Sequence, residues 1–307
     1  MKELVYLIGG SGFVGKHLSV FLSYNFDVTI FDKKIDTEYF SSYPQINTCE
    51  LDVVHSQIPE SFPVPSFIIN LASTLVTASR DLENFDGIIA ENVKILLNLF
   101  ERFRNQRGMK LFIQFGSIEE YGNGLSPFVE TQRELPNSVY ALLKQTTTNT
   151  AMMLNCNYNF PAMVLRPGNL FGPGQSKERF IPYVFNQMRE NKPLAVTRCD
   201  QKRDYIYITD FNDIIKEILS GYRVFVGEVV NVSSGRSTAL KKLIEEMKLL
   251  LHSTSEVHYG KLPYRENEAM NLECSVEKLE RLLDKNLSIN TLDRLRNYID
   301  DMIKYEL

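Results

Sequence analysis

The chain has 307 residues, of which 44% are hydrophobic and 23% are charged, and its formal net charge is −4. This composition is typical of a globular protein with a large core, and the negative charge argues against a broad nucleic-acid-binding face. No apolar stretch approaches the roughly 20 residues that a membrane helix needs. The four cysteines show no disulfide or metal-ligand spacing. We therefore expect a cytoplasmic protein with no metal site and with neither a nucleic-acid nor a membrane partner.

Short apolar runs alternate with longer helical patterns through the first half of the chain. Runs rich in β-branched and aromatic residues predict strands at 4–8, 27–31, 66–72, 110–115 and 161–166. The stretches between them predict helices at 14–24, 85–104 and 139–155. This alternation predicts an α/β fold: a doubly wound, mostly parallel sheet with helices on both faces.

A glycine-rich loop follows the first predicted strand and opens the first predicted helix. The segment GGSGFVG contains Gly9, Gly12, Phe13, Val14 and Gly15. Glycines at this spacing let a pyrophosphate approach the backbone, and the helix N-terminus presents free N–H groups to it. The strand–loop–helix context makes this loop a predicted dinucleotide-binding site, in which these five residues contact the cofactor.

Asp32 ends the next predicted strand, about 20 residues beyond the glycines. A carboxylate at this place accepts hydrogen bonds from the ribose hydroxyls of adenosine and would repel a 2′-phosphate. NAD is therefore the favoured cofactor. Lys33 and Lys34 follow immediately and could meet a phosphate, so NADP remains an alternative.

The regular alternation of strand and helix patterns ends after Arg166, where a loop rich in glycine and proline begins. The clearest later strands are RDYIYITD and EVVNVSS, and the tail from about Leu240 is mainly helical. We assign residues 1–166 to a Rossmann dinucleotide-binding domain, which later strands near 204–233 rejoin. Residues 167–307 form mainly a smaller lobe, which we expect over the carboxyl edge of the sheet.

A tyrosine and a lysine lie four residues apart in SVYALLKQT, so Tyr140 and Lys144 share one face of a predicted helix. Ser117 follows a predicted strand, at the sheet edge that faces the ligand. The ammonium of Lys144 and a cationic nicotinamide would both lower the pKa of the Tyr140 phenol. Tyr140 could then exchange a proton with a sugar hydroxyl while Ser117 holds the same oxygen.

The chain resembles the extended short-chain dehydrogenase/reductases that act on nucleotide sugars, the epimerase/dehydratase family. The resemblance rests on ordered motifs along most of the chain: GGSGFVG, NLAS, FGSIEEYG, SVYALLK, LRPGNLFGPG, RDYIYITD and YRENEAMNLECSVEKLERLL. It implies that Ser117, Tyr140 and Lys144 are the catalytic triad, with Tyr140 and Lys144 also contacting the cofactor. Further cofactor contacts implied by it are Asp52, Val53, Leu71, Ala72 and Pro167.

The same resemblance implies a nucleotide-diphosphate sugar as substrate. Substrate contacts expected from it are Ser117, Glu119, Asn169, Arg179, Arg203 and Arg265. Arginine suits a diphosphate because its planar fork is permanently charged. Family members also pair two helices across a homodimer interface, which predicts a homodimer through 85–104 and 139–155.

Four functions remain open, in this order of preference. The first is an NAD-retaining epimerase that inverts a sugar carbon, most plausibly C4, with Tyr140 as acid and base. The second is a reductase of a nucleotide-activated 4-keto-6-deoxyhexose that consumes NADH or NADPH. A 4,6-dehydratase comes third, because Ile118 stands where such enzymes carry an aspartic acid. A non-catalytic dinucleotide sensor comes last, because a sensor has no need of the triad.

Overall fold

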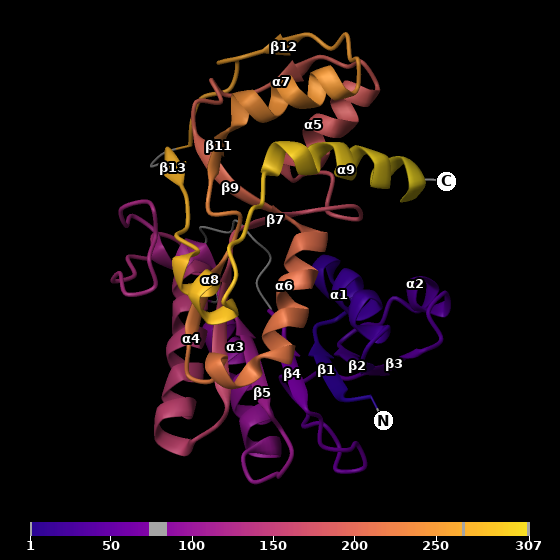
Figure 1. Cartoon of the computed structure of the whole chain (residues 1–307), viewed down its shortest axis with the longest axis vertical. Coiled ribbons are helices and arrows are strands. Elements are labelled where there is room, and N and C mark those ends of the chain that lie inside the picture. Colours follow the sequence, from indigo (N-terminus) through magenta and orange to yellow (C-terminus); the bar gives the residue numbers. More distant parts are fainter. Residues whose placement is uncertain (1, 74–84, 266–267, 306–307) are drawn as a thin grey trace.

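The computed structural model describes residues 2–73, 85–265 and 268–305 (Figure 1). Its centre is a seven-stranded sheet in the order β10-β6-β5-β4-β1-β2-β3, in which every neighbouring pair is parallel. The strands are β1 (Leu4–Ile8), β2 (Asp27–Asp32), β3 (Ile46–Glu50), β4 (Phe67–Asn70), β5 (Leu111–Phe115), β6 (Ala162–Pro167) and β10 (Val229–Val232). The predicted doubly wound α/β fold is confirmed.

Helices cover both faces of this sheet. They are α1 (Phe13–Ser23), α2 (Thr37–Ser41), α3 (Phe85–Phe103), α4 (Val139–Tyr158) and α6 (Ile208–Ser220). Leu18 of α1 and Phe211 of α6 belong to one buried cluster, while Leu96 of α3 and Ala151 of α4 belong to another. The central strands are mostly apolar because each is buried between these two clusters.

Helix α4 and strand β3 both differ from the sequence-based prediction. Helix α4 runs three residues further than expected and ends where Asn159 adopts the left-handed conformation (φ 53°). Strand β3 was not predicted, because its sequence INTCE is polar. It pairs with β2 at the sheet edge, and only Ile46 is buried there, so no apolar alternation marks it.

The second lobe contains its own small sheet and lies above one end of the central sheet in Figure 1. Strands β7 (Asn169–Phe171), β9 (Lys202–Tyr207), β11 (Ser237–Ala239) and β13 (Asn271–Leu272) form that sheet, and β8 (Leu194–Ala195) pairs with β12 (Val257–His258). The remaining helices are α5 (Phe180–Arg189), α7 (Leu240–Leu250), α8 (Glu277–Leu283) and α9 (Thr291–Tyr305), with 3₁₀ helices η1 (Ile118–Tyr121) and η2 (Tyr222–Phe225).

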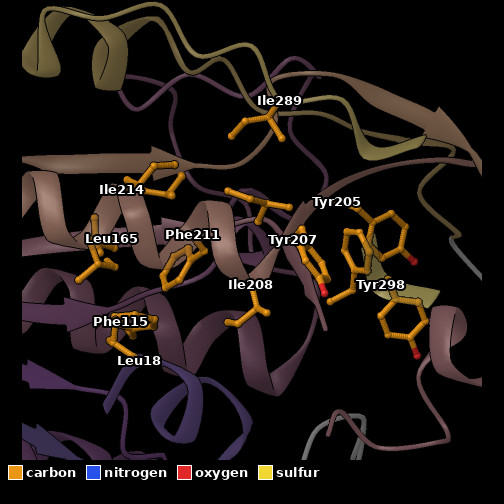
Figure 2. Close-up of a cluster of buried hydrophobic side chains, with 14 of the residues drawn as sticks. Leu18, Phe115, Leu165, Tyr205, Tyr207, Ile208, Phe211, Ile214, Ile289 and Tyr298 are labelled. Carbon is orange, nitrogen blue, oxygen red and sulfur yellow. The ribbon is translucent and has the colours of Figure 1, made fainter. Parts of the chain in front are cut away.

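The prediction that strands near 204–233 rejoin the central sheet is right for β10 and wrong for β9. Strand β10 pairs with β6, whereas β9 pairs with β7, β11 and β13. The backbone groups of β9 are therefore satisfied inside the lobe. Its aromatic side chains, Tyr205 and Tyr207, pack among lobe residues such as Tyr298 (Figure 2).

One apolar core joins the lobe to the central sheet. Figure 2 shows Phe115 of β5 and Leu165 of β6 close to Phe211 of α6, with Ile208 between this group and the lobe tyrosines. The rings of Phe115 and Phe211 meet edge to face, with centroids 5.8 Å apart. This shared packing holds the lobe over the carboxyl ends of β5 and β6. None of the described helices is long and apolar enough to cross a membrane.

Candidate active site

The glycine loop has a backbone that only glycine tolerates. Gly9 has a φ of +78°, and a Cβ there would lie 2.8 Å from the backbone of Ala72; a Cβ on Gly15 would lie 2.5 Å from the backbone of Gly10. Helix α1 begins at Phe13, and no side chain caps it at Gly12. Its first N–H groups are thus left to a ligand, which fits the pyrophosphate of a dinucleotide.

Asp32 lies beside this loop, because its Oδ2 accepts a hydrogen bond from the Ser11 N–H at 2.9 Å. Lys33 turns toward Asp52, with its Nζ 3.6 Å from Oδ2 of that carboxylate. One of the two lysines that kept NADP open is therefore paired with an acid. Asp52 also accepts from the Val54 N–H at 2.9 Å, which fixes the turn that contains Val53.

Leu71, Ala72 and Pro167 also lie at the ends of the central strands. Leu71 and Ala72 directly follow β4, where the Ala72 N–H donates to the side chain of Asn70 at 3.3 Å. Pro167 is the last residue of β6. The predicted cofactor contacts in the loops and strand ends thus lie at the carboxyl ends of the central strands.

The three predicted catalytic residues are brought together. Ser117 follows β5 by two residues, and α4 carries Tyr140 and Lys144 after Ser138 caps its first turn. The Lys144 Nζ lies 5.8 Å from the centroid of the Tyr140 ring and donates to the backbone oxygen of Phe115 at 3.1 Å. A hydrogen bond links the hydroxyl groups of Ser117 and Tyr140.

The net effect of the protein's own groups is to raise the pKa of the Tyr140 phenol, and the predicted fall with a cationic nicotinamide stays a prediction. Burial raises this pKa to about 12, and the nearby Glu119 carboxylate raises it further, while the Ser117 hydrogen bond opposes the rise. Burial also lowers the pKa of Lys144 to about 8. The desolvation of both groups was not visible in the sequence.

Three arginines that are far apart in the sequence converge on Glu119. Burial raises the pKa of this carboxyl, and the charges of Arg179, Arg265 and Arg203 oppose that rise. Glu119 keeps an exposed face, as do Arg179 and Arg265. A cationic group of this kind beside the triad suits an anionic substrate such as a diphosphate.

Two of the predicted substrate residues also hold the lobe together. Arg203 forms an ion pair with Glu268 and donates to the backbone oxygen of Ala269 at 2.7 Å. Asn169 donates to the backbone oxygen of Asp204 at 3.3 Å. Residues 266–267 of the YRENEAM motif lie outside the described residues.

Sequence reasoning missed a buried ion-pair network behind Ser117. Arg166 is 1% exposed and contacts both Glu120, which is fully buried, and Glu134. In the sequence Glu120 is one of two adjacent glutamates, and only its place as third residue of a capping box at Ser117 could have singled it out. Ile118, by contrast, is buried against Tyr121 and offers no proton.

Comparison with known proteins places this site in a family. The sequence profile of the NAD dependent epimerase/dehydratase family matches residues 5–233. The dTDP-4-dehydro-6-deoxyglucose reductase of Escherichia coli is 27% identical over 84% of this chain and 85% of its own length. A putative UDP-glucose 4-epimerase of Methanocaldococcus jannaschii is 25% identical over 91% and 92% of the two chains.

Solved structures agree in fold. The UDP-glucuronic acid 4-epimerase of Bacillus cereus, in complex with UDP-glucuronic acid and NAD, superimposes with a TM-score of 0.88. The alignment covers 99% of this chain and 100% of that one, at 20% identity. Together with the glycine loop and the assembled triad, these matches show that the chain is an enzyme that belongs to the NAD dependent epimerase/dehydratase family.

Proposed function

We propose that the protein is a reductase that converts the 4-keto group of a nucleotide-activated 6-deoxyhexose to a hydroxyl. A dihydronicotinamide held by the glycine loop and Asp32 would supply the hydride. Tyr140 donates its phenolic proton to the keto oxygen, and Ser117 donates a hydrogen bond to the same oxygen. Lys144 keeps a positive charge near the phenolate that Tyr140 leaves behind.

The observation that carries this proposal is the Glu119 carboxylate beside Tyr140. Burial of the phenol raises the pKa of Tyr140 to about 12, and the negative charge of Glu119 adds to that rise, so both favour the protonated form. A phenol held protonated is ready to act as an acid, which a reductase needs at the start of each turnover. An epimerase needs a deprotonated phenol at the start of turnover, because its first step removes a proton from the sugar hydroxyl.

The epimerase remains the second candidate, and the cofactor site favours it. Asp32 and the Lys33–Asp52 pair suit NAD rather than NADP, and an epimerase retains NAD through each turnover. The 4,6-dehydratase is disfavoured, since Ile118 is apolar and 4% exposed. The assembled triad argues against a silent sensor.

NAD(H) fits the glycine loop and the Asp32 carboxylate. We assign the substrate diphosphate to Arg179, Arg203 and Arg265, with Asn169 on the sugar side.

We also propose a homodimer through α3 and α4. Apolar side chains on the outer faces of these helices, Leu97, Leu142, Met153 and Tyr158, are 36–53% exposed. Light scattering should give twice the monomer mass at micromolar concentration; a monomer would contradict the pairing. Cytoplasmic location stays a prediction.

The test supplies the purified enzyme with NADH and a nucleoside diphosphate that carries 4-keto-6-deoxyglucose. The nucleoside is thymidine, uridine, cytidine and guanosine in turn. We expect one NADH to be oxidised for each keto sugar consumed, with at least one nucleotide. A parallel reaction contains UDP-glucose without added cofactor. Formation of UDP-galactose there, with no oxidation of NADH in the first reaction, would overturn the reductase and favour the epimerase.

A further inference from the structure

The buried carboxylate of Glu120 touches the catalytic triad from behind. Helix η1 begins after Ser117, whose Oγ accepts from the Glu119 N–H at 3.1 Å. In return, the Ser117 N–H donates to Glu120 Oε1 at 2.8 Å. This reciprocal pair fixes the backbone of the catalytic serine.

The same carboxylate contacts two other segments that carry the site. The Thr148 hydroxyl donates to Oε1 at 3.1 Å, and Thr148 lies one turn beyond Lys144 on the same face of α4. The Arg166 Nε donates to Oε2 at 2.9 Å, from the end of β6. Gly116 makes room for this arrangement, because a Cβ there would lie 2.3 Å from Oε1.

Glu120 is best satisfied as an anion. Burial raises its pKa, while the Arg166 charge and the Ser117 and Thr148 hydrogen bonds oppose that rise. All four contacts to its two oxygens come from donors. A protonated carboxyl would therefore place its own hydrogen against the hydrogen of one of these donors. Arg166 is balanced in turn by Glu134, which lies in the segment that leads to Tyr140.

Lys144 depends on this negative charge. It is 6% exposed, and burial lowers its pKa to about 8, while the Glu120 carboxylate opposes the fall. Besides Glu120, the charged or titratable groups near the triad are Tyr140 on the same helix, Glu119 on η1, Arg166 on β6 and Arg179 before α5. The charge that acts on Lys144 is that of Glu120.

We propose that Glu120 is a positioning residue for the reaction: its buried carboxylate fixes the Ser117 turn and supplies the negative charge that keeps Lys144 an ammonium. The consequence has a definite sign. Lys144 is charged below its pKa and loses its charge as pH rises through about 8. Without the Glu120 charge, the pKa of Lys144 is lower, so Lys144 loses its positive charge at a pH closer to neutral.

The test measures Lys144 directly, so it does not depend on the proposed substrate. The protein is labelled with ¹³C-lysine, and the Cε resonance that disappears in Lys144→Arg is followed from pH 6 to pH 11. In Glu120→Gln we expect its midpoint to fall by about one pH unit, which is about tenfold less ammonium at a given pH above the midpoint. Glu120→Asp keeps the charge and should restore the midpoint of the wild type.

Glu134→Gln is the matched control. It also removes a carboxylate from Arg166, but the side chain of Glu134 bonds neither Ser117 nor Thr148. We expect its Lys144 midpoint to match the wild type. An equal fall in Glu134→Gln and Glu120→Gln, or no fall in Glu120→Gln, would overturn the proposal.

Glu120→Gln leaves the buried Arg166 with one carboxylate, and breaking a buried ion pair destabilises the fold. If thermal melting shows that it does not fold, Glu120→Gln combined with Arg166→Gln removes both charges of the pair. The Lys144 midpoint should still fall in this double variant, since the charge that acts on Lys144 is absent. A midpoint unchanged from the wild type there would equally refute the role of Glu120.

Discussion

The two sides of the site are built in different ways. On the side of the central sheet, Ser117 and Lys144 are buried and held by hydrogen bonds from β5, η1 and α4. On the side of the lobe, Arg179 and Arg265 are exposed and lie in segments outside regular strands. Groups that exchange a proton must keep one geometry, whereas groups that bind a diphosphate can rely on charge. We therefore propose that the sheet side determines the reaction and that the lobe side determines which substrate enters.

The largest effect is expected on the sheet side. Tyr140→Phe removes only the hydroxyl that transfers the proton, so turnover should fall by about 10²–10⁴-fold. The fold and NAD(H) binding should remain, which circular dichroism and a cofactor titration would check. Near-normal kcat on the true substrate would refute the role of Tyr140.

A change on the lobe side should alter binding instead. Arg265→Ala removes one cation near Glu119, and hydrogen bonds to charged groups are worth about 1.5–3 kcal/mol. We expect KM for the nucleotide sugar to rise about 10–100-fold with little change in kcat. Arg198→Ala serves as control, because Arg198 is an exposed lobe arginine paired with Asp200. If kcat fell as strongly as it does in Tyr140→Phe, the division between the two sides would be wrong.

A substitution of Asp32 tests the predicted cofactor-binding residues on the sheet side. Asp32→Ala should weaken NAD(H) by about tenfold, or about 1.4 kcal/mol, and narrow or reverse its preference over NADP(H). Titration of both dinucleotides into wild type and variant measures this. A wild type that prefers NADP(H) would mean that Lys34, rather than the acid, governs recognition.

The smallest effect is expected at Glu119, which lies between Tyr140 on the sheet side and the arginines on the lobe side. Glu119→Gln removes a charge that raises the pKa of Tyr140, so the phenol should lose its proton at lower pH. For a reductase, which uses the protonated phenol, the fall of kcat at alkaline pH should then move downward by about one pH unit. A faster reaction at neutral pH would indicate that Tyr140 acts first as a base.

Motifs with a fixed spacing were readable from the sequence. The glycine loop and Asp32 were predicted from their spacing after two strands, and the triad from the resemblance to the family. The structure brings the three triad residues together, and the roles of all these residues stay predictions. Strand β3 was missed because an edge strand can be polar, and β9 was placed in the wrong sheet because its apolar pattern does not reveal its partner. The Arg166–Glu120 pair was missed because nothing in the sequence shows that either charge is buried.

The most direct test of the account follows the hydride. NADH that carries deuterium in the transferring position is given to the enzyme with the accepted 4-keto nucleotide sugar, and the product is examined by mass spectrometry and NMR. We predict one deuterium at C4 of each product molecule and one NAD formed with it. If the enzyme instead inverts C4 of a saturated nucleotide sugar, retains its NAD and incorporates no deuterium, the protein is an epimerase and the reductase proposal is wrong.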